Sequence, residues 1–200
     1  MNYEALIALL VFIVPMCFSP GPNNMLCAAH GSQHGFRATI PLTIGMVVGW
    51  SSLGLAVGMA TVFIEENQQV FLLLTYIGAA YIAYLGYKIA FQDTTKEKEN
   101  TETEKLGFTT GLMLQIVNGK AWVHFLVMMT SWGTLFGTGF ASKAILVGIN
   151  AIAGYPAVLT WAVFGVGLSK IFSTPEKARI LNGLLGISLF SVAVWISLPH

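Results

Sequence analysis

The sequence predicts an all-α, polytopic membrane protein of six transmembrane helices, built as two inverted three-helix repeats with broken first and fourth helices. Of the 200 residues, 55% are hydrophobic and only 10% are charged, whereas a soluble domain carries roughly a quarter charged residues. With so few charges, lipid must replace water over most of the surface. The apolar residues form windows, each long enough for the roughly 20 residues that cross a bilayer: 4–29, 40–64, 69–91, 108–136, 143–169 and 179–198.

The basic residues predict the orientation of these helices. Eight of the ten Lys and Arg residues follow the first, third or fifth window, Lys143 lies on the opposite side, and Lys120 lies inside a window. By the positive-inside rule, the odd-numbered loops face the cytoplasm and both termini face the other side. The first window does not read as a cleaved signal peptide, because such a peptide opens with positive charge and the first basic residue is Arg37.

A polar segment divides the chain into two halves. Residues 92–106 read QDTTKEKENTETEKL, a charged run without apolar periodicity that predicts a cytoplasmic linker. It separates a first three-helix repeat (1–91) from a second (107–200). Since three is odd, the second repeat must be inverted relative to the first, as in many secondary transporters.

The first window is interrupted by Pro20, Gly21, Pro22, Asn23 and Asn24. Two prolines and a glycine within three residues predict a broken helix. Irregular backbone at membrane depth survives only where protein or a water-filled cavity covers it. Two interpretations stay open: a structural kink whose asparagine amides satisfy freed backbone groups, or a solute site. In the second, a zwitterion would place its carboxylate on free N–H groups and its ammonium on free carbonyls.

The second interruption lies in the window 108–136. On a straight helix Gln115 and Asn118 share a face and Lys120 does not, but a break at Asn118-Gly119 would bring all three to one cavity. Lys120 either serves function, as intramembrane charges usually do, or snorkels to the interface. None of the nine acidic residues lies in a membrane core, so the proton-coupling candidates are Lys120 and His124, four residues apart on one face.

Other residue patterns favour packing over chemistry. Gly45-x-x-x-Gly49 and Gly54-x-x-x-Gly58 permit close helix approach, either within one chain or in a homodimer. Both cysteines lie in the first window, without metal-site spacing. We therefore expect no metal and no other cofactor. No basic patch is large enough to follow a nucleic-acid backbone.

Together these elements resemble the LysE/RhtB family of amino-acid exporters, over nearly the whole chain. The most specific pair is Gly-Pro-Asn-Asn (21–24) with Gln-x-x-Asn-x-Lys (115–120). Further matching elements are Gly35-Phe36-Arg37, Gly45-x-x-x-Gly49, Gly78-Ala79-Ala80-Tyr81, Tyr84-Leu85-Gly86-Tyr87-Lys88 and the alanine at 121.

The resemblance implies proton-coupled antiport that exports small amino acids or derivatives across the bacterial inner membrane. Combined with the orientation predicted above, both termini are then expected to be periplasmic. It implies substrates of the homoserine/threonine or cysteine/O-acetylserine type. It also implies that two polar elements line the substrate path, formed by Gly21, Pro22, Asn23, Asn24, Gln115, Asn118 and Lys120. This chain departs at Gly119, where many members have proline, so we expect the fourth helix to open less sharply.

Other functions meet specific obstacles. A membrane thiol-redox conduit needs a cysteine in each half, and the fourth window has none. A metal-ion exporter needs intramembrane carboxylates, histidine clusters or thiolates, for which only Cys17, Cys27 and His124 are available. A membrane hydrolase needs a nucleophile with a base or a metal motif, and no such constellation appears. We therefore expect a transporter and no enzyme.

Overall fold

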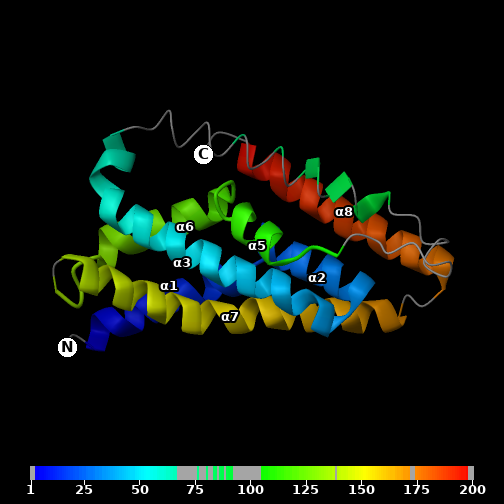
Figure 1. The fold of residues 1–200 in the computed structure, drawn as a ribbon, viewed down its shortest axis with the longest axis horizontal. Helices are drawn as coiled ribbons and strands as arrows, with labels where there is room; N and C mark the ends of the chain where they lie inside the picture. The colour runs from blue at the N-terminus through cyan, green and yellow to red at the C-terminus, as the bar shows by residue number, and fades with distance from the viewer. Residues whose placement is uncertain are drawn as a thin grey trace.

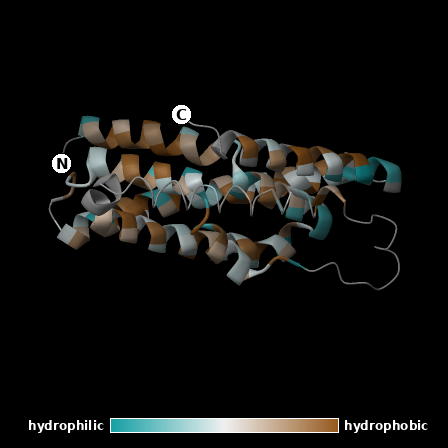
Figure 2. Cartoon of the chain, turned by 90° about the horizontal axis from the view of Figure 1, so that it is seen from above, coloured by the Kyte–Doolittle hydropathy of each residue, from teal (hydrophilic) through white to brown (hydrophobic). Residues whose placement is uncertain are grey.

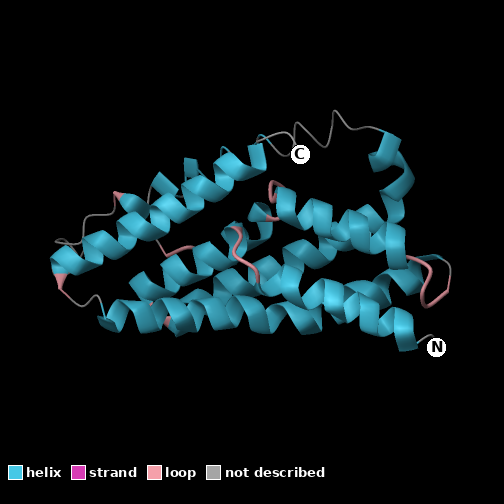
Figure 3. Ribbon diagram, turned by 180° about the vertical axis from the view of Figure 1, so that it is seen from behind, coloured by secondary structure: helices cyan, strands magenta, loops and turns pink. Residues whose placement is uncertain are grey.

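The computed structural model consists of helices and loops, with no strand among the residues it describes (Figure 3). These residues are 3–66, 76, 80, 83–84, 86–87, 89–91, 105–137, 139–171 and 174–197. Their helices are α1 (Tyr3–Phe18), α2 (Pro22–His34), α3 (Phe36–Glu66), α5 (Phe108–Leu114), α6 (Gly119–Trp132), α7 (Gly139–Ile171) and α8 (Pro175–Ser197). The all-helical prediction is confirmed for this part of the chain.

The first predicted break lies between α1 and α2, whose axes differ by 44°. Gly21 precedes α2 in an extended conformation (φ −176°, ψ 175°), and Pro22 is the first helical residue. Proline suits that position, because its missing N–H would have no intrahelical partner there. The predicted window is too short at its end, since α2 continues to His34.

The second break lies between α5 and α6 and is the sharper of the two, at 60°. Asn118 has φ −84° and ψ 90°, and its side chain caps α6 by accepting a hydrogen bond from the Ala121 N–H. The predicted break at Asn118-Gly119 is therefore present, while the comparison with family members that have proline at 119 stays a prediction. Asn118, the residue before Gly119, caps α6, so the helix can begin at Gly119 without a proline at this first helical position.

The described helices account for two to four membrane spans. Within α3 and α7, Phe36–Ala60 and Gly139–Lys170 are each long and apolar enough to cross alone, and each bent pair adds one if counted as a single span. The third predicted window lies mostly outside the described residues. The sixth coincides largely with α8, which is not among those four. The count of six remains a prediction.

Each long helix packs along both halves of a bent pair. The helix α3 contacts α5 and α6, and α7 contacts α1 and α2. Glycines permit these approaches: a β-carbon on Gly45 would collide with the Phe108 carbonyl oxygen, and one on Gly165 with the Ala28 carbonyl oxygen. The glycines at 45, 49, 54 and 58 face α5 or α6 of the same chain, so they serve packing within one chain and are not free for a dimer contact.

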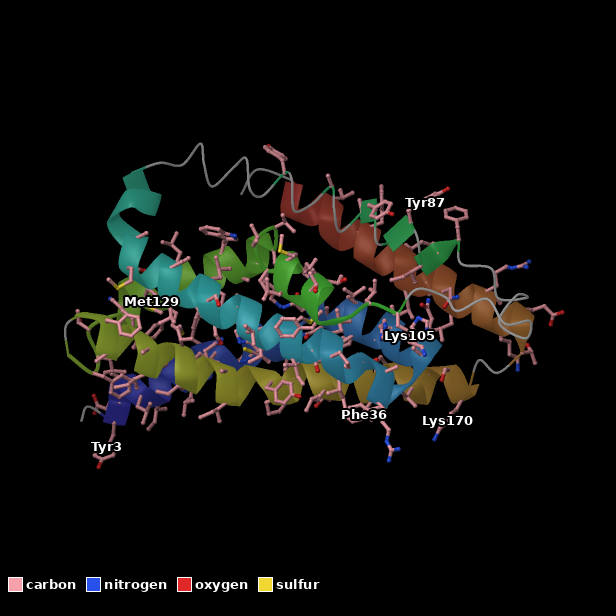
Figure 4. All side chains as sticks on the ribbon, in the orientation of Figure 1. Tyr3, Phe36, Tyr87, Lys105, Met129 and Lys170 are labelled. Carbon is pink, nitrogen blue, oxygen red and sulfur yellow. The ribbon has the colours of Figure 1, made fainter. Side chains whose placement is uncertain are left out.

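The two bent pairs run in opposite directions (Figure 1). Figure 4 shows Tyr3 of α1 and Met129 of α6 at one end of the molecule, and Phe36, Lys105 and Lys170 at the other. Hydrophobic residues cover much of the helices (Figure 2), and many are exposed, such as Ile152 at 79%. Exposed apolar side chains at this density are typical of a lipid-facing surface.

A buried histidine of α2, His30, forms a hydrogen bond to the backbone just before α5. The Nδ1 of His30 lies 2.9 Å from the Thr39 hydroxyl, which itself donates to the Gly35 carbonyl, and its Nε2 accepts the Leu106 N–H at 3.1 Å. Since the hydroxyl proton is already used, Nδ1 must be the donor, which fixes the neutral tautomer of the ring. Sequence analysis gave this residue no role, because its partners lie 9 and 76 residues away along the chain.

Candidate functional site

A cavity of about 70 Å³ lies where the two breaks meet. All eight predicted site and coupling residues line it: Gly21, Pro22, Asn23, Asn24, Gln115, Asn118, Lys120 and His124. The other lining residues are Met16, Cys17, Trp50, Ala121, Phe125, Asn150, Gly154 and Val158. Breaks that are more than 90 residues apart in sequence thus share one chamber.

Three amide side chains join the breaks directly. Asn23 and Gln115 form a reciprocal pair: Asn23 Nδ2 donates to Gln115 Oε1 at 2.9 Å, and Gln115 Nε2 donates to Asn23 Oδ1 at 3.1 Å. Asn118 Nδ2 donates to both acceptor oxygens, at 3.1 and 3.3 Å. Gln115 also donates to the Gly111 carbonyl at 3.0 Å. A network whose members all find partners holds the two irregular segments in fixed register.

The carbonyl end of α1 is covered by side chains. Asn24 Nδ2 donates to the carbonyls of Cys17 at 2.7 Å and Ser19 at 2.9 Å, and Trp161 Nε1 donates to the carbonyl of Phe18 at 3.1 Å. A helix end leaves its last carbonyls without intrahelical partners, and in a membrane these must be satisfied internally. Asn24 therefore follows the first of the two interpretations: its amide serves freed backbone groups.

Lys120 also binds this end of α1 across the break. Its ammonium donates to the Ser19 hydroxyl at 2.8 Å, the Ser19 carbonyl at 3.0 Å and the Pro20 carbonyl at 3.4 Å. The side chain passes close to Gly21, where an added β-carbon would lie 2.9 Å from Lys120 Cδ. The snorkelling alternative is wrong, because the ammonium turns to a helix terminus. The free carbonyls expected for a substrate ammonium are already occupied.

His124 takes part in a polar chain on another wall of the cavity. Its Nε2 lies 2.7 Å from Asn150 Oδ1, and Cys17 Sγ lies 3.8 Å from the same oxygen. Phe12 stacks on the imidazole with ring centroids 5.1 Å apart. His124 is thus both packed and hydrogen-bonded, and it still faces the cavity.

Two of the eight lining residues that sequence analysis did not predict, Asn150 and Trp50, bring polar groups to the cavity. Asn150 is buried at 3% exposure, and a polar residue inside an apolar window was the signal that could have found it. Trp50 is 7% exposed, and its Nε1 has no hydrogen-bond partner among the described residues. In the sequence, a single tryptophan within an apolar window cannot be distinguished from a residue that only packs. Only the tertiary structure shows that Trp50 lines the cavity.

The electrostatics of the cavity suit a small zwitterion. The first turns of α2 and α6 both reach it, through Asn23 and Asn24 on one side and Lys120 and Ala121 on the other. Helix N-termini carry partial positive charge and free N–H donors, which attract a carboxylate. The carbonyl end of α1 carries partial negative charge. Phe125 and Val158 add an apolar wall.

Comparison with known proteins gives a consistent result. The LysE type translocator family matches residues 14–198. The cysteine/O-acetylserine efflux proteins of Salmonella typhimurium and Salmonella choleraesuis are each 31% identical to this chain over 180 residues, covering 89% of this chain and 90% of theirs. The protein of that name from Escherichia coli is 29% identical over 182 residues. No solved protein structure matches the chain.

The family model spans most of the chain, including both breaks and every residue that lines the cavity. The fold, the polar chamber and the sequence comparisons therefore agree. This protein belongs to the LysE type translocator family.

Proposed function

We propose that this protein exports a small amino acid or a close derivative, of the cysteine/O-acetylserine or homoserine/threonine type, and that the substrate binds in the cavity between the two breaks. The observation that carries this proposal is the meeting of two helix breaks, from oppositely directed helices, at one polar chamber. The similar proteins named for cysteine and O-acetylserine efflux support the substrate class. We assign it no enzymatic activity.

The proposed architecture consists of two inverted repeats, 1–91 and 107–200, joined by the linker 92–106. Two observations support it: α3 packs on both halves of one bent pair, and α7 packs on both halves of the other. The end that carries Lys105 and Lys170 (Figure 4) is the basic end. In a bacterial inner membrane this end would face the cytoplasm and both termini the periplasm.

The bound amino acid would use each wall of the cavity differently. Its carboxylate would face the first turns of α2 and α6, near Gly21, Pro22 and Asn23. The amides of Gln115 and Asn118 would fix its position, as preorganised polar groups do in small-molecule sites. Its side chain would extend toward the apolar wall. A cavity volume of about 10–15 Å³ holds one water molecule. The cavity volume of about 70 Å³ therefore suits a solute of a few heavy atoms, such as a small amino acid.

Counterflow in proteoliposomes tests the export function. Purified protein is reconstituted with unlabelled cysteine, O-acetylserine, homoserine or threonine inside, and uptake of the labelled compound is followed, with lysine as a charged control. We expect at least one small amino acid to exchange about tenfold faster than in empty liposomes, and lysine to remain at background. Background exchange for the whole panel would refute the proposal.

Proton coupling is the finer part of the proposal, and Lys120 and His124 are its candidate groups. Both line the cavity, and no acidic residue of the described chain does. We expect a pH gradient to drive uphill amino-acid transport that a protonophore abolishes. His124→Gln keeps a side-chain N–H for Asn150, so we expect it to retain counterflow and to lose most of the response to the gradient. Full uphill transport by this variant would leave Lys120 as the coupling group.

A further inference from the structure

The groups that cover the carbonyl end of α1 differ in how easily they can leave. Asn24 is a short side chain, buried at 3% exposure, on the helix that follows the break. Trp161 is a rigid ring on the long helix α7. Lys120 reaches its oxygens through a flexible four-carbon chain and is only partly buried. Among the described residues, it is the one covering group that can be withdrawn without moving a helix.

The oxygens around Lys120 form a complete shell for a primary ammonium. A lysine ammonium has three N–H donors and no acceptor, and three oxygens lie within reach: Ser19 Oγ at 2.8 Å, Ser19 O at 3.0 Å and Pro20 O at 3.4 Å. The α-ammonium of an amino acid has the same charge and the same three donors. The partial negative charge at the end of α1 favours either cation.

We propose that the Ser19 and Pro20 oxygens form an ammonium subsite, which Lys120 occupies in the empty transporter and the substrate's α-ammonium occupies in exchange. The inference rests on the proposed export function. Lys120 is then a tethered competitor of the substrate. A permanent Lys120 contact would instead keep these three oxygens from the substrate's α-ammonium.

Close packing over Gly21 restricts which cations fit. An added β-carbon there would lie 3.0 Å from Lys120 Nζ, so the shell lies against the backbone of the break and admits a slender headgroup. A primary ammonium on a short alkyl chain meets both requirements, size and three donors. A quaternary ammonium has the charge but no N–H group, and it is too broad for the shell.

The test uses binding of a small amine to the full-length protein, read by thermal stability in detergent. Lys120→Ala vacates the subsite, and we expect ethylammonium at tens of millimolar to raise its Tm by about 2–4 °C, since a ligand that binds only the folded state stabilises it. We expect no rise for the wild type, whose subsite is filled, and none with tetramethylammonium or sodium at equal concentration. Should Lys120→Ala fail to fold, Lys120→Ser purified with and without ethylammonium replaces it.

A second lysine provides the matched control. Lys143 donates to the Gly133 carbonyl at 3.1 Å, outside the cavity, so Lys143→Ala removes an ammonium–carbonyl contact without opening the subsite. We expect ethylammonium to leave its Tm unchanged. Equal stabilisation of the wild type, Lys120→Ala and Lys143→Ala, or stabilisation of none of them, would overturn the inference.

The exchange itself is tested with the substrate that counterflow identifies. In Tm titrations we expect Lys120→Ala to bind this amino acid about three- to tenfold more tightly than the wild type does, because the competing ammonium is gone. We expect both proteins to bind the deaminated analogue, which has no ammonium group, with equal affinity. Weaker binding of the amino acid to Lys120→Ala would overturn the exchange. The two proposals fail separately: wild-type liposomes without counterflow refute export, whereas an absent amine response in a transporting protein refutes the subsite.

Discussion

Replacing Asn24 with alanine is expected to abolish amino-acid counterflow while the protein still inserts into the membrane. The substitution removes both hydrogen bonds to the α1 carbonyls, at 2.7 Å to Cys17 and 2.9 Å to Ser19. The Ser19 carbonyl keeps its hydrogen bond from Lys120, whereas the Cys17 carbonyl loses its side-chain partner, and a buried carbonyl left without a partner costs about 1–3 kcal/mol. The carbonyl can regain a hydrogen bond only if α2 moves or if water enters the break. Either change displaces the cavity residues at the start of α2.

Counterflow and gel filtration of Asn24→Ala, run side by side, measure this effect. The matched control is Asn182→Ala, which removes another buried asparagine, 6% exposed, whose Oδ1 accepts a hydrogen bond from Gln33 at 3.2 Å. Asn182 does not line the cavity, so we expect that variant to transport within about twofold of the wild type. Transport by Asn24→Ala at the control rate would show that the break tolerates uncapped carbonyls.

Replacing Gly165 with leucine is expected to prevent correct folding. At this position α7 lies against α2 so closely that an added β-carbon would collide with the Ala28 carbonyl oxygen. Backbone cannot yield as a flexible side chain can, so the helices must separate. Overpacking of this kind costs about 3 kcal/mol or more, and the separated helices would no longer seal the cavity wall. We expect little monodisperse protein after extraction and no counterflow.

The control lies two residues further along α7. A β-carbon on Gly167 would have no atom within 4 Å among the described residues, so Gly167→Leu adds the same side chain at a site with space. We expect that variant to be extracted and to transport like the wild type. Equal yields of the two variants would show that the close approach of α2 and α7 is dispensable.

The sequence by itself determined the membrane character and the positions of both breaks. These properties depend on residues that are close together in the sequence. Long apolar runs define the spans, and a helix is interrupted, whatever it packs against, by Pro20, Gly21 and Pro22 or by an Asn118 cap. The two interruptions, together with the family resemblance, also identified eight positions, six of them with polar side chains, that the structure brings to one cavity. That they bind substrate remains our proposal.

Only the tertiary structure decided what each polar group touches. Lys120 and Ser19 are 101 residues apart, and Trp161 and Phe18 are 143 apart, so no periodicity could predict that the end of α1 is covered from two other helices. Nor could it identify Asn150 as the partner of His124, or the greater bend at the second break. Helix breaks arise from prolines, glycines and capping side chains within a few residues. The hydrogen-bond partners of the broken ends are set instead by the packing of α3 and α7 across both bent pairs.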